Sequence, residues 1–379
     1  MKDDHAWAVR LSHAVHRHLL WLLIASYAVA ALMPGPGLWL RGVSLGRIEL
    51  FGQRFHLALP GAMLSLLLFN AGLGVSLSHL RGMLRRPTVL LAGLAVNFFV
   101  PLLFLAGVSW LLGRFWHNPQ EVQCIIAGMA LVVAMPVAGS STAWSQNADG
   151  DLATSLGLVL GSTLLSPLTT PFVLQSASLL TTGDYADQLR ELSDNGTGLF
   201  LLTCVLLPSL LGMLCRLLIG EGRVKELLPA VKLVNAFDLL LLCYSNAAVS
   251  LPEAVANPDA DFVVAMLLLT LGLCLLGFGS GWLVARSFGV DAGRRNALVF
   301  GLGMNNNGTG LVLAATALAA YPRIMQPIIV YNLVQHLVAA AVTWLLLRQP
   351  ALVPAGMSSA RCRRDGTVCG AGPVGRRLE

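Results

Sequence analysis

Two short stretches of the sequence combine residue types that bind ions or anions when they interrupt a helix. The first, 134–144, contains Pro136, Gly139, Ser140 and Ser141. Pro136 removes a backbone hydrogen-bond donor and clashes with the preceding turn, whereas serines are good caps for a helix that restarts. The start of such a half-helix presents free N–H groups and a positive dipole end, which stabilise a negatively charged ligand.

The second stretch, 301–310, holds four glycines and the triplet Asn305–Asn307. This composition makes a poor helix, and lipid does not tolerate its free polar groups. We therefore expect an anion to bind where the two stretches meet. The candidate substrate-binding residues are Ser140, Ser141, Asn306, Asn307, Thr309 and, from a later stretch, His336.

The composition describes a membrane protein. The chain has 379 residues, of which 56% are hydrophobic and 12% are charged, and its mean hydropathy is +0.72. Charged residues are about half as frequent as in soluble proteins. The net charge of +6 is typical of basic loops facing anionic lipid, and no basic patch interleaved with aromatic residues indicates nucleic-acid binding. The seven cysteines include no C-x-x-C pair and indicate neither a disulfide framework nor a zinc site.

Ten apolar stretches are long enough to cross a bilayer, which needs about 20 residues per helix. The sequence thus predicts an all-α polytopic protein with ten transmembrane helices. The first stretch also resembles a signal peptide, because basic residues precede it and small residues end it; we expect a true span. The stretches are 19–33, 57–78, 87–112, 122–146, 152–180, 197–219, 231–250, 262–286, 294–320 and 324–347.

Basic residues favour one side of the membrane. With both termini in the cytoplasm, 19 of the 25 Lys and Arg residues lie on the cytosolic side and 6 outside. This bias predicts an even number of spans and cytoplasmic termini, in a plasma or inner membrane. We expect one membrane domain over 1–348 and a disordered cytoplasmic tail over 349–379.

The two interruptions fall in the fourth and ninth spans, which are equivalent positions in two five-helix halves. Paired interruptions of this kind are typical of secondary transporters built from inverted repeats. Small residues also serve close helix packing, and we apply that interpretation to Gly161, Gly212, Gly272 and Gly277. It does not explain Asn305–Asn307, since three amides are costly in lipid.

Further patterns accompany the interruptions, and the most specific is Ser162-Thr-Leu-Leu-Ser-Pro-Leu-Thr-Thr-Pro171. It is similar to a fifth-helix pattern, S-T-L-x-S-P-L-x-T-P, of the bile acid:sodium symporter family. Pro136–Ser141 followed by 148–155, Gly303-Met-Asn-Asn-Asn-Gly308 and His336 match the same family. Over residues 57–347 the chain therefore resembles a bacterial-type member of that family.

The resemblance implies a carrier of organic anions, such as bile acids, steroid conjugates or small keto and hydroxy acids, and not an enzyme. It implies a panel of spans over 19–78 and 197–250 that moves, for alternating access, relative to a core over 87–180 and 262–347. The broken helices cross in this core. Besides substrate and lipid, no obligatory protein partner and no cofactor is expected, with sodium as a coupling ion.

The resemblance also implies two sodium sites. In this sequence Thr142 replaces an Asn of the first site, and a further Thr ligand falls on Val159. The matching positions are Ser141, Thr142 and Ser155 for the first site, and Asn97, Leu302, Met304 and Asn305 for the second.

Gly301 is the largest departure, because the family has there a Glu shared by both sodium sites. No Asp or Glu occurs between Asp291 and Asp365, so an alignment shift cannot supply the carboxylate. The sequence leaves open whether sodium, protons or no ion drives the carrier.

Two other classes fit the sequence less well. A cation/proton antiporter of similar fold needs a carboxylate in the middle of the core spans, and these spans offer none. A serine hydrolase using Ser140 or Ser141 with His336 would lack an orienting acid. Asp238, inside the seventh span, is a candidate for ion coupling, and its pairing with Lys232 is the alternative.

Overall fold

The computed structural model of the chain describes residues 18–50, 53–75, 87–194 and 197–348, together with positions 11 and 15. The tail expected over 349–379 and the segment 76–86 lie outside the described residues. Within these ranges the chain is almost entirely helical, in agreement with the predicted all-α class.

The helices follow the expected apolar stretches, and the fourth and ninth stretches each form two helices. The first nine stretches and their connections give α2 (Leu19–Leu32), α3 (Gly35–Gly42), α4 (Leu59–Leu73), α6 (Pro87–Phe115), α7 (Pro119–Ala134), α8 (Ser140–Asn147), α9 (Leu152–Ser178), α10 (Asp184–Asp194), α11 (Thr197–Leu201), α12 (Leu207–Ile219), α13 (Glu221–Ala247), α14 (Leu251–Ala256), α15 (Ala260–Ser287), α16 (Ala292–Gly303) and α17 (Asn307–Ala317). A π-helical segment, Leu202–Leu206, joins α11 to α12, and a 3-10 turn, Pro322–Ile324, precedes α18 (Met325–Arg348).

Six segments of the described chain are long and apolar enough to cross a membrane, namely α6, α9, α11–α12, α13, α15 and α18 with its 3-10 turn. The pair α2 and α3, bent by 93°, adds a seventh if it counts as one span, and α4 and α7 are apolar but shorter. The chain is therefore a multi-pass helical membrane protein. The number of ten spans stays a prediction, because the fourth and ninth are each divided into shorter helices.

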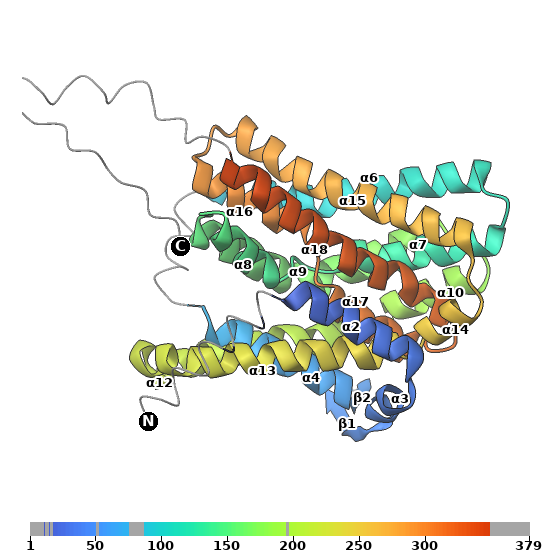
Figure 1. Ribbon diagram of the computed structural model, residues 1–379, viewed down its shortest axis with the longest axis horizontal. Coiled ribbons are helices and arrows are strands. Elements are labelled where there is room, and N and C mark those ends of the chain that lie inside the picture. The colour runs from blue at the N-terminus through green and yellow to red at the C-terminus, as the bar shows by residue number, and fades with distance from the viewer. Residues whose placement is uncertain are drawn as a thin grey trace, which may run out of the picture.

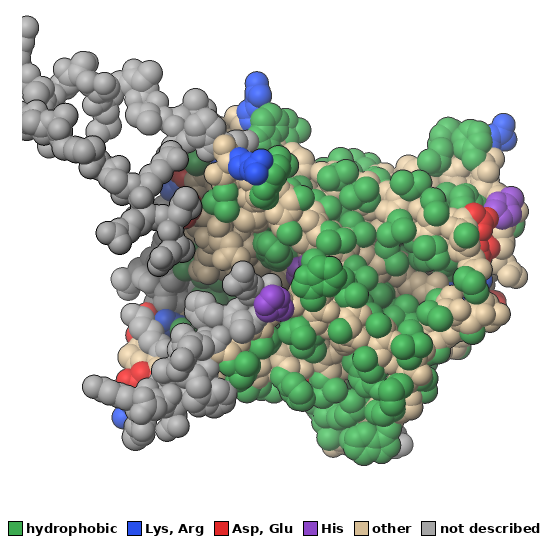
Figure 2. All heavy atoms as spheres, in the orientation of Figure 1, with side chains coloured by type: hydrophobic (Ala, Val, Ile, Leu, Met, Phe, Trp, Pro, Cys, Tyr) green, Lys and Arg blue, Asp and Glu red, His purple; other side chains and the backbone are tan. Residues whose placement is uncertain are grey.

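An apolar belt surrounds the helices. On the face drawn in Figure 2, hydrophobic side chains cover the middle of the molecule, and the charged side chains shown lie near its two ends. Leu103, Leu168 and Leu268 are 69%, 75% and 65% exposed. Apolar surface of this extent is expected to contact lipid, because water would not tolerate it.

The helices form two groups. In Figure 1, α4, α12 and α13 lie along one side of the molecule, and α2 and α3 pack on α13. In the other group, α15 packs on α6, α16 and α18, and α9 packs on α6, α7 and α16. The helices that lead into the two breaks are enclosed by protein, since 124–134 of α7 and 296–303 of α16 are buried throughout.

Residues 44–58 differ from the prediction, which gave a loop here and a second span from 57. They form two antiparallel strands, β1 (Ser44–Leu50) and β2 (Gln53–Ala58), with Ser44 paired to Ala58 and Leu50 to Gln53. Polar and apolar residues alternate in both strands, as is typical of a β-hairpin. A search for long apolar runs does not detect such a two-residue alternation.

Two helices reach beyond the expected spans. α10 (Asp184–Asp194) lies between the predicted spans 152–180 and 197–219, where no helix was predicted, and α13 begins at Glu221 rather than near 231. Both extra helical segments carry charged residues, so they lie outside what a hydropathy criterion can find. Near the N-terminus, α2 packs in the bundle, where Ser26 Oγ donates to the Leu240 carbonyl at 2.9 Å.

Glycines allow α4 and α12 to pack closely against each other. A Cβ atom on Gly212 would overlap the backbone carbonyl of Phe69, and one on Gly72 would overlap that of Ser209. The packing role expected for Gly212 is therefore confirmed, and the same holds for Gly277, whose Cβ would lie 2.6 Å from the Leu302 carbonyl oxygen.

We expect Gly212→Ala to destabilise the protein by about 1–3 kcal/mol, because backbone rather than a flexible side chain must move. Gly107→Ala is the matched control, since a Cβ there meets nothing within 4 Å. Thermal unfolding of both variants in detergent is the measurement. Equal unfolding midpoints for the two variants would contradict the described α4–α12 contact.

Candidate functional site

The first break separates α7 from α8 around Pro136, as predicted, and α9 supplies the partners that its backbone needs. Thr170 Oγ1 donates to the Ala134 carbonyl at the end of α7, with an O–O distance of 2.6 Å. The N–H of Val137 donates to Ser162 Oγ at 3.0 Å. Polar groups released by the break are thus satisfied by side chains of α9, as buried backbone requires.

The second break separates α16 from α17 within the Asn triplet, also as predicted. The N–H of Asn305 donates to Gln335 Oε1 at 3.1 Å, and Asn305 Nδ2 donates to the Val132 carbonyl at 3.1 Å. Asn306 caps the new helix, since its Oδ1 accepts the N–H of Thr309 at 3.2 Å. The consecutive amides therefore have separate roles in holding the break.

The two breaks meet. The N–H of Ala138 donates to the Met304 carbonyl at 2.9 Å, and the N–H of Asn306 donates to the Pro136 carbonyl at 2.9 Å. Two extended segments from opposite halves of the chain thus form a short antiparallel bridge, Val137 to Asn305. This bridge brings together the start of α8 and the start of α17.

Polar atoms near this bridge lack partners within the described chain. Ser141 Oγ, Thr309 Oγ1 and Asn307 Oδ1 have no hydrogen-bond partner, and these side chains are 0%, 0% and 2% exposed. Leaving a buried polar group unsatisfied costs about 1–3 kcal/mol. Ser141 and Thr309, in the first turns of α8 and α17, offer a ligand two hydroxyl donors beside two positive helix ends, whereas Asn307 Oδ1 can only accept.

A polar network joins the second break to Tyr27 of α2. Asn307 Nδ2 donates to Asn332 Oδ1 at 3.5 Å, and Gln335 Nε2 donates to the same oxygen at 3.3 Å. Asn332 Nδ2 donates to Tyr27 Oη at 2.7 Å. Sequence reasoning took only His336 from this part of α18, although Asn332 and Gln335 are visible there as polar residues in an apolar stretch.

His336 lies beside α8 rather than in the bridge itself. Its Nδ1 accepts a hydrogen bond from Trp144 Nε1 at 3.3 Å, and the ring is 6% exposed. An Nδ1 that accepts carries no proton, so the neutral ring keeps its proton on Nε2. The pair links α18 to the first half-helix and leaves Nε2 as the polar atom available to a ligand.

Two of the three residues expected at the first sodium site, Thr142 and Ser155, contact each other. Ser155 Oγ donates to Thr142 Oγ1 at 3.0 Å, which places two hydroxyl oxygens from α9 and α8 side by side. Ser141 precedes Thr142 on α8 and is fully buried. The Thr142 and Ser155 oxygens are close enough to share one small cation, whereas Ser141 Oγ has no hydrogen-bond partner among the described residues.

Two residues expected at the second sodium site, Met304 and Asn305, form hydrogen bonds with other parts of the chain. Asn97 Oδ1 on α6 is buried without a partner, whereas Asn305 and Met304 are held by the hydrogen bonds of the breaks. The described hydrogen bonds join Asn305 to α7 and α18, not to Asn97. Leu302, the remaining member of the set, lies in an apolar cluster.

The place of the family's Glu is filled by an apolar side chain. A Cβ atom on Gly301 would overlap Leu158 Cδ1, and Leu158 is 0% exposed. Around it lie further buried aliphatic residues, namely Val89, Val137, Val284, Leu298 and Leu302. The surroundings of Gly301 therefore fit neither a carboxylate nor a sodium ion that depends on one.

Asp238 is buried in α13 at 6% exposure, and its Oδ2 has no hydrogen-bond partner within the described chain. Asn235, three residues earlier, accepts a hydrogen bond from Asn70 Nδ2 at 2.7 Å. Farther along the helix, both amide atoms of Asn246 lack partners. Sequence reasoning missed Asn246, which is visible only as a polar residue in an apolar run.

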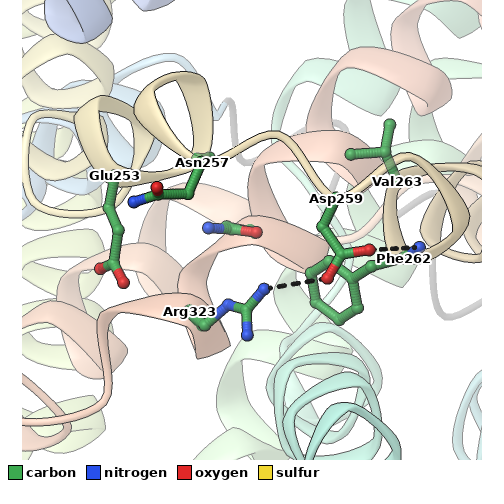
Figure 3. A pocket seen from close by; sticks show the side chains of 8 residues that line it. Glu253, Asn257, Asp259, Phe262, Val263 and Arg323 are labelled. Atoms are coloured by element: carbon green, nitrogen blue, oxygen red, sulfur yellow. Dashed lines mark hydrogen bonds and ion pairs between the residues drawn. The ribbon is translucent and has the colours of Figure 1, made fainter. Parts of the chain in front are cut away.

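A separate cavity of about 160 Å³, drawn in Figure 3, is lined in part by α14, which lies with α10 at one end of the molecule in Figure 1. Arg323 lies between Glu253 and Asp259 and pairs with Asp259 at 3.3 Å. Hydrogen bonding with Asp261 lowers the pKa of the Asp259 carboxyl group, so Asp259 is ionised at neutral pH. Because Arg323 is already paired, this cavity offers an anion little attraction.

These features define a multi-pass helical membrane protein in which two broken helices meet at buried polar residues. The chain belongs to the sodium bile acid symporter family, whose model matches residues 62–256. The family is one of sodium-dependent transporters and sodium/metabolite cotransporters.

Three relatives illustrate the range of the family. The uncharacterized protein YbaS of Bacillus subtilis is 26% identical over 283 residues, covering 74% of this chain and 86% of the relative. The uncharacterized sodium-dependent transporter YocS of the same organism is 24% identical over 255 residues, covering 66% and 72%. The probable sodium/metabolite cotransporter BASS1, chloroplastic, of Arabidopsis thaliana is 28% identical over 251 residues, covering 66% and 57%.

We expect the effects of Gly301→Ala and Leu158→Ala on stability to be non-additive. Each alone destabilises, by overpacking or by leaving a cavity, and the pair costs less than the sum because the shorter residue 158 makes room for the new methyl group. Thermal unfolding of the two single variants and the double variant in detergent measures the coupling. Additive shifts would mean that the two positions do not touch.

Proposed function

We propose that the chain is a secondary active transporter of an organic anion, working by alternating access. The substrate is a carboxylate of the bile-acid-like, steroid-conjugate or small keto or hydroxy acid type. The observation that carries this proposal is the meeting of two half-helix starts beside Ser141 and Thr309, whose buried hydroxyls lack partners.

The chemistry of this place favours a carboxylate. Each half-helix start stabilises an anion by about 0.3–1 kcal/mol, and by more where the site is buried. The hydroxyls of Ser141 and Thr309 then donate to the carboxylate, and Ser140 and Asn306, both half-buried, lie at the approach to it. The amide of Asn307 and Nε2 of His336 orient the remainder of the substrate.

One sodium ion, rather than two, is proposed as the coupling ion. Ser141, Thr142 and Ser155 provide three hydroxyl oxygens for it, and two of these oxygens are 3.0 Å apart. The second site requires the carboxylate that Gly301 replaces, and Leu158 occupies that space. Proton coupling or uncoupled exchange is the alternative that the experiment below distinguishes.

The proposed architecture has ten spans in two inverted repeats, with both termini in the cytoplasm and the chain in the cell or inner membrane. The breaks lie in the fourth and ninth spans, and each is followed by a restarting helix, α8 or α17. In this proposal α2, α4, α12 and α13 form the panel, and the remaining spans form the core that moves against it. The α10/α14 end then faces outward.

Uptake into proteoliposomes tests the proposal. Full-length protein is reconstituted and supplied with a panel of labelled carboxylates in sodium, in choline, and with an imposed pH step. We expect accumulation of at least one carboxylate in sodium but not in choline, with a linear dependence of the rate on low sodium concentration. No uptake of any carboxylate in all three conditions would contradict a carrier of organic anions.

Ser141→Ala and Thr309→Val test the site directly, because neither hydroxyl has a hydrogen-bond partner among the described residues. We expect uptake to fall about tenfold or more for each, which corresponds to about 1.4 kcal/mol, while the unfolding midpoint is unchanged or rises. Thr170→Val is the matched control, since Thr170 holds the Ala134 carbonyl, and its unfolding midpoint should fall. Full uptake by both site variants would exclude the bridge as the binding site.

A further inference from the structure

Three potential metal ligands converge at the α10/α14 end, outside the site described above. The ligand atoms of His117, Glu121 and Asp261 all lie within 4.8 Å of one another. His117 precedes α7, Glu121 lies in the first turn of α7, and Asp261 lies in the first turn of α15. His117 Nε2 and Asp261 Oδ2 are 3.2 Å apart.

The distances suit a small divalent ion. Two ligands each about 2.1 Å from one zinc ion at a tetrahedral angle are about 3.4 Å apart, close to the distance between the imidazole and the Asp261 carboxylate. The His117 and Asp261 side chains are 67% and 53% exposed, so the ion has a path from water. A water molecule would complete a four-coordinate site.

Glu121 is held in place as metal ligands usually are. Glu121 is only 6% exposed. Its two carboxylate oxygens accept hydrogen bonds from Trp116 Nε1 at 2.8 Å and from Asn118 Nδ2 at 2.6 Å. Neutral donors that orient a ligating carboxylate are typical of the shell around a metal's own ligands.

The charges around Glu121 and Asp261 favour a bound cation. Asp259, close to Asp261 and Glu121, is paired with Arg323. Within the described part of the chain, neither Glu121 nor Asp261 forms an ion pair with a Lys or Arg. Glu121 is a buried carboxylate whose two side-chain donors, Trp116 and Asn118, are neutral; this arrangement is costly, and a divalent ion would reduce the cost.

We propose that His117, Glu121 and Asp261 bind a divalent transition-metal ion of the zinc type, which ties the start of α15 to the start of α7. One imidazole and two carboxylates select zinc, cobalt or manganese over calcium or magnesium, which prefer oxygen ligands alone. The proposed transport at the bridge does not depend on this site.

Titration with zinc and cobalt tests the proposal. Full-length protein in detergent, with Cys362 and Cys369 replaced by Ser in every sample and no affinity-tag histidines, is stripped of metal with a chelator. We expect one zinc ion to bind per chain by calorimetry and to raise the unfolding midpoint. Cobalt should give visible d–d absorption bands with the intensity of a four-coordinate site.

His117→Ala and Asp261→Asn should each weaken zinc binding at least tenfold and remove the cobalt bands. Without metal, the unfolding midpoints of both variants should stay close to that of the metal-free parent. His18→Ala, an exposed histidine before α2, is the matched control and should bind zinc like the parent. Calcium and magnesium should not raise the midpoint. The proposal is wrong if zinc binds the His117 and Asp261 variants as tightly as the parent, or if the parent binds none and His117 and Asp261 form an ion pair only.

Discussion

Backbone that leaves a helix inside a membrane must find hydrogen-bond partners within the protein, because lipid offers none. In this chain the two interrupted segments are each other's partners, through the bonds from Ala138 to Met304 and from Asn306 to Pro136. Each bond contributes only about 0.5–1.5 kcal/mol net, but an unmade one costs about 1–3 kcal/mol. Each break therefore helps to stabilise the other, and the two bonds place two helix starts side by side.

The residues around the bridge fall into those that hold the backbone and those that do not. Thr170, Ser162, Gln335 and the Asn305 amide satisfy backbone groups, so their hydroxyl and amide groups serve the fold. The hydroxyls of Ser141 and Thr309 have no hydrogen-bond partner in the part of the chain that the structure describes. A substitution that damages the first group changes stability, whereas one in the second group changes only what the protein binds.

Much of this arrangement could be predicted from sequence, because its signals are local. Pro136 with its neighbouring Gly and Ser residues, and the Asn triplet between glycines, are local helix-breaking patterns, whereas Pro101 lies inside the unbroken helix α6; the apolar runs predict the helices around both breaks. The hairpin over 44–58 and the helix α10 were missed, since their short or amphipathic patterns are weak beside long apolar runs. The filling of the Gly301 space by Leu158, and the network from Asn307 to Tyr27, depend on contacts between distant segments, which no local pattern encodes.

The central claim is that the bridge attracts negative charge within the membrane domain. Ser140, half-buried at the start of α8, allows a direct test by Ser140→Cys in a variant without the seven native cysteines. The rates of modification by an anionic and a cationic methanethiosulfonate of similar size are compared with those of a free thiol in solution. Two helix starts predict a relative preference for the anionic reagent of about tenfold, reduced by a transported carboxylate. A preference for the cationic reagent, or no modification by either, would contradict an anion site at the crossing.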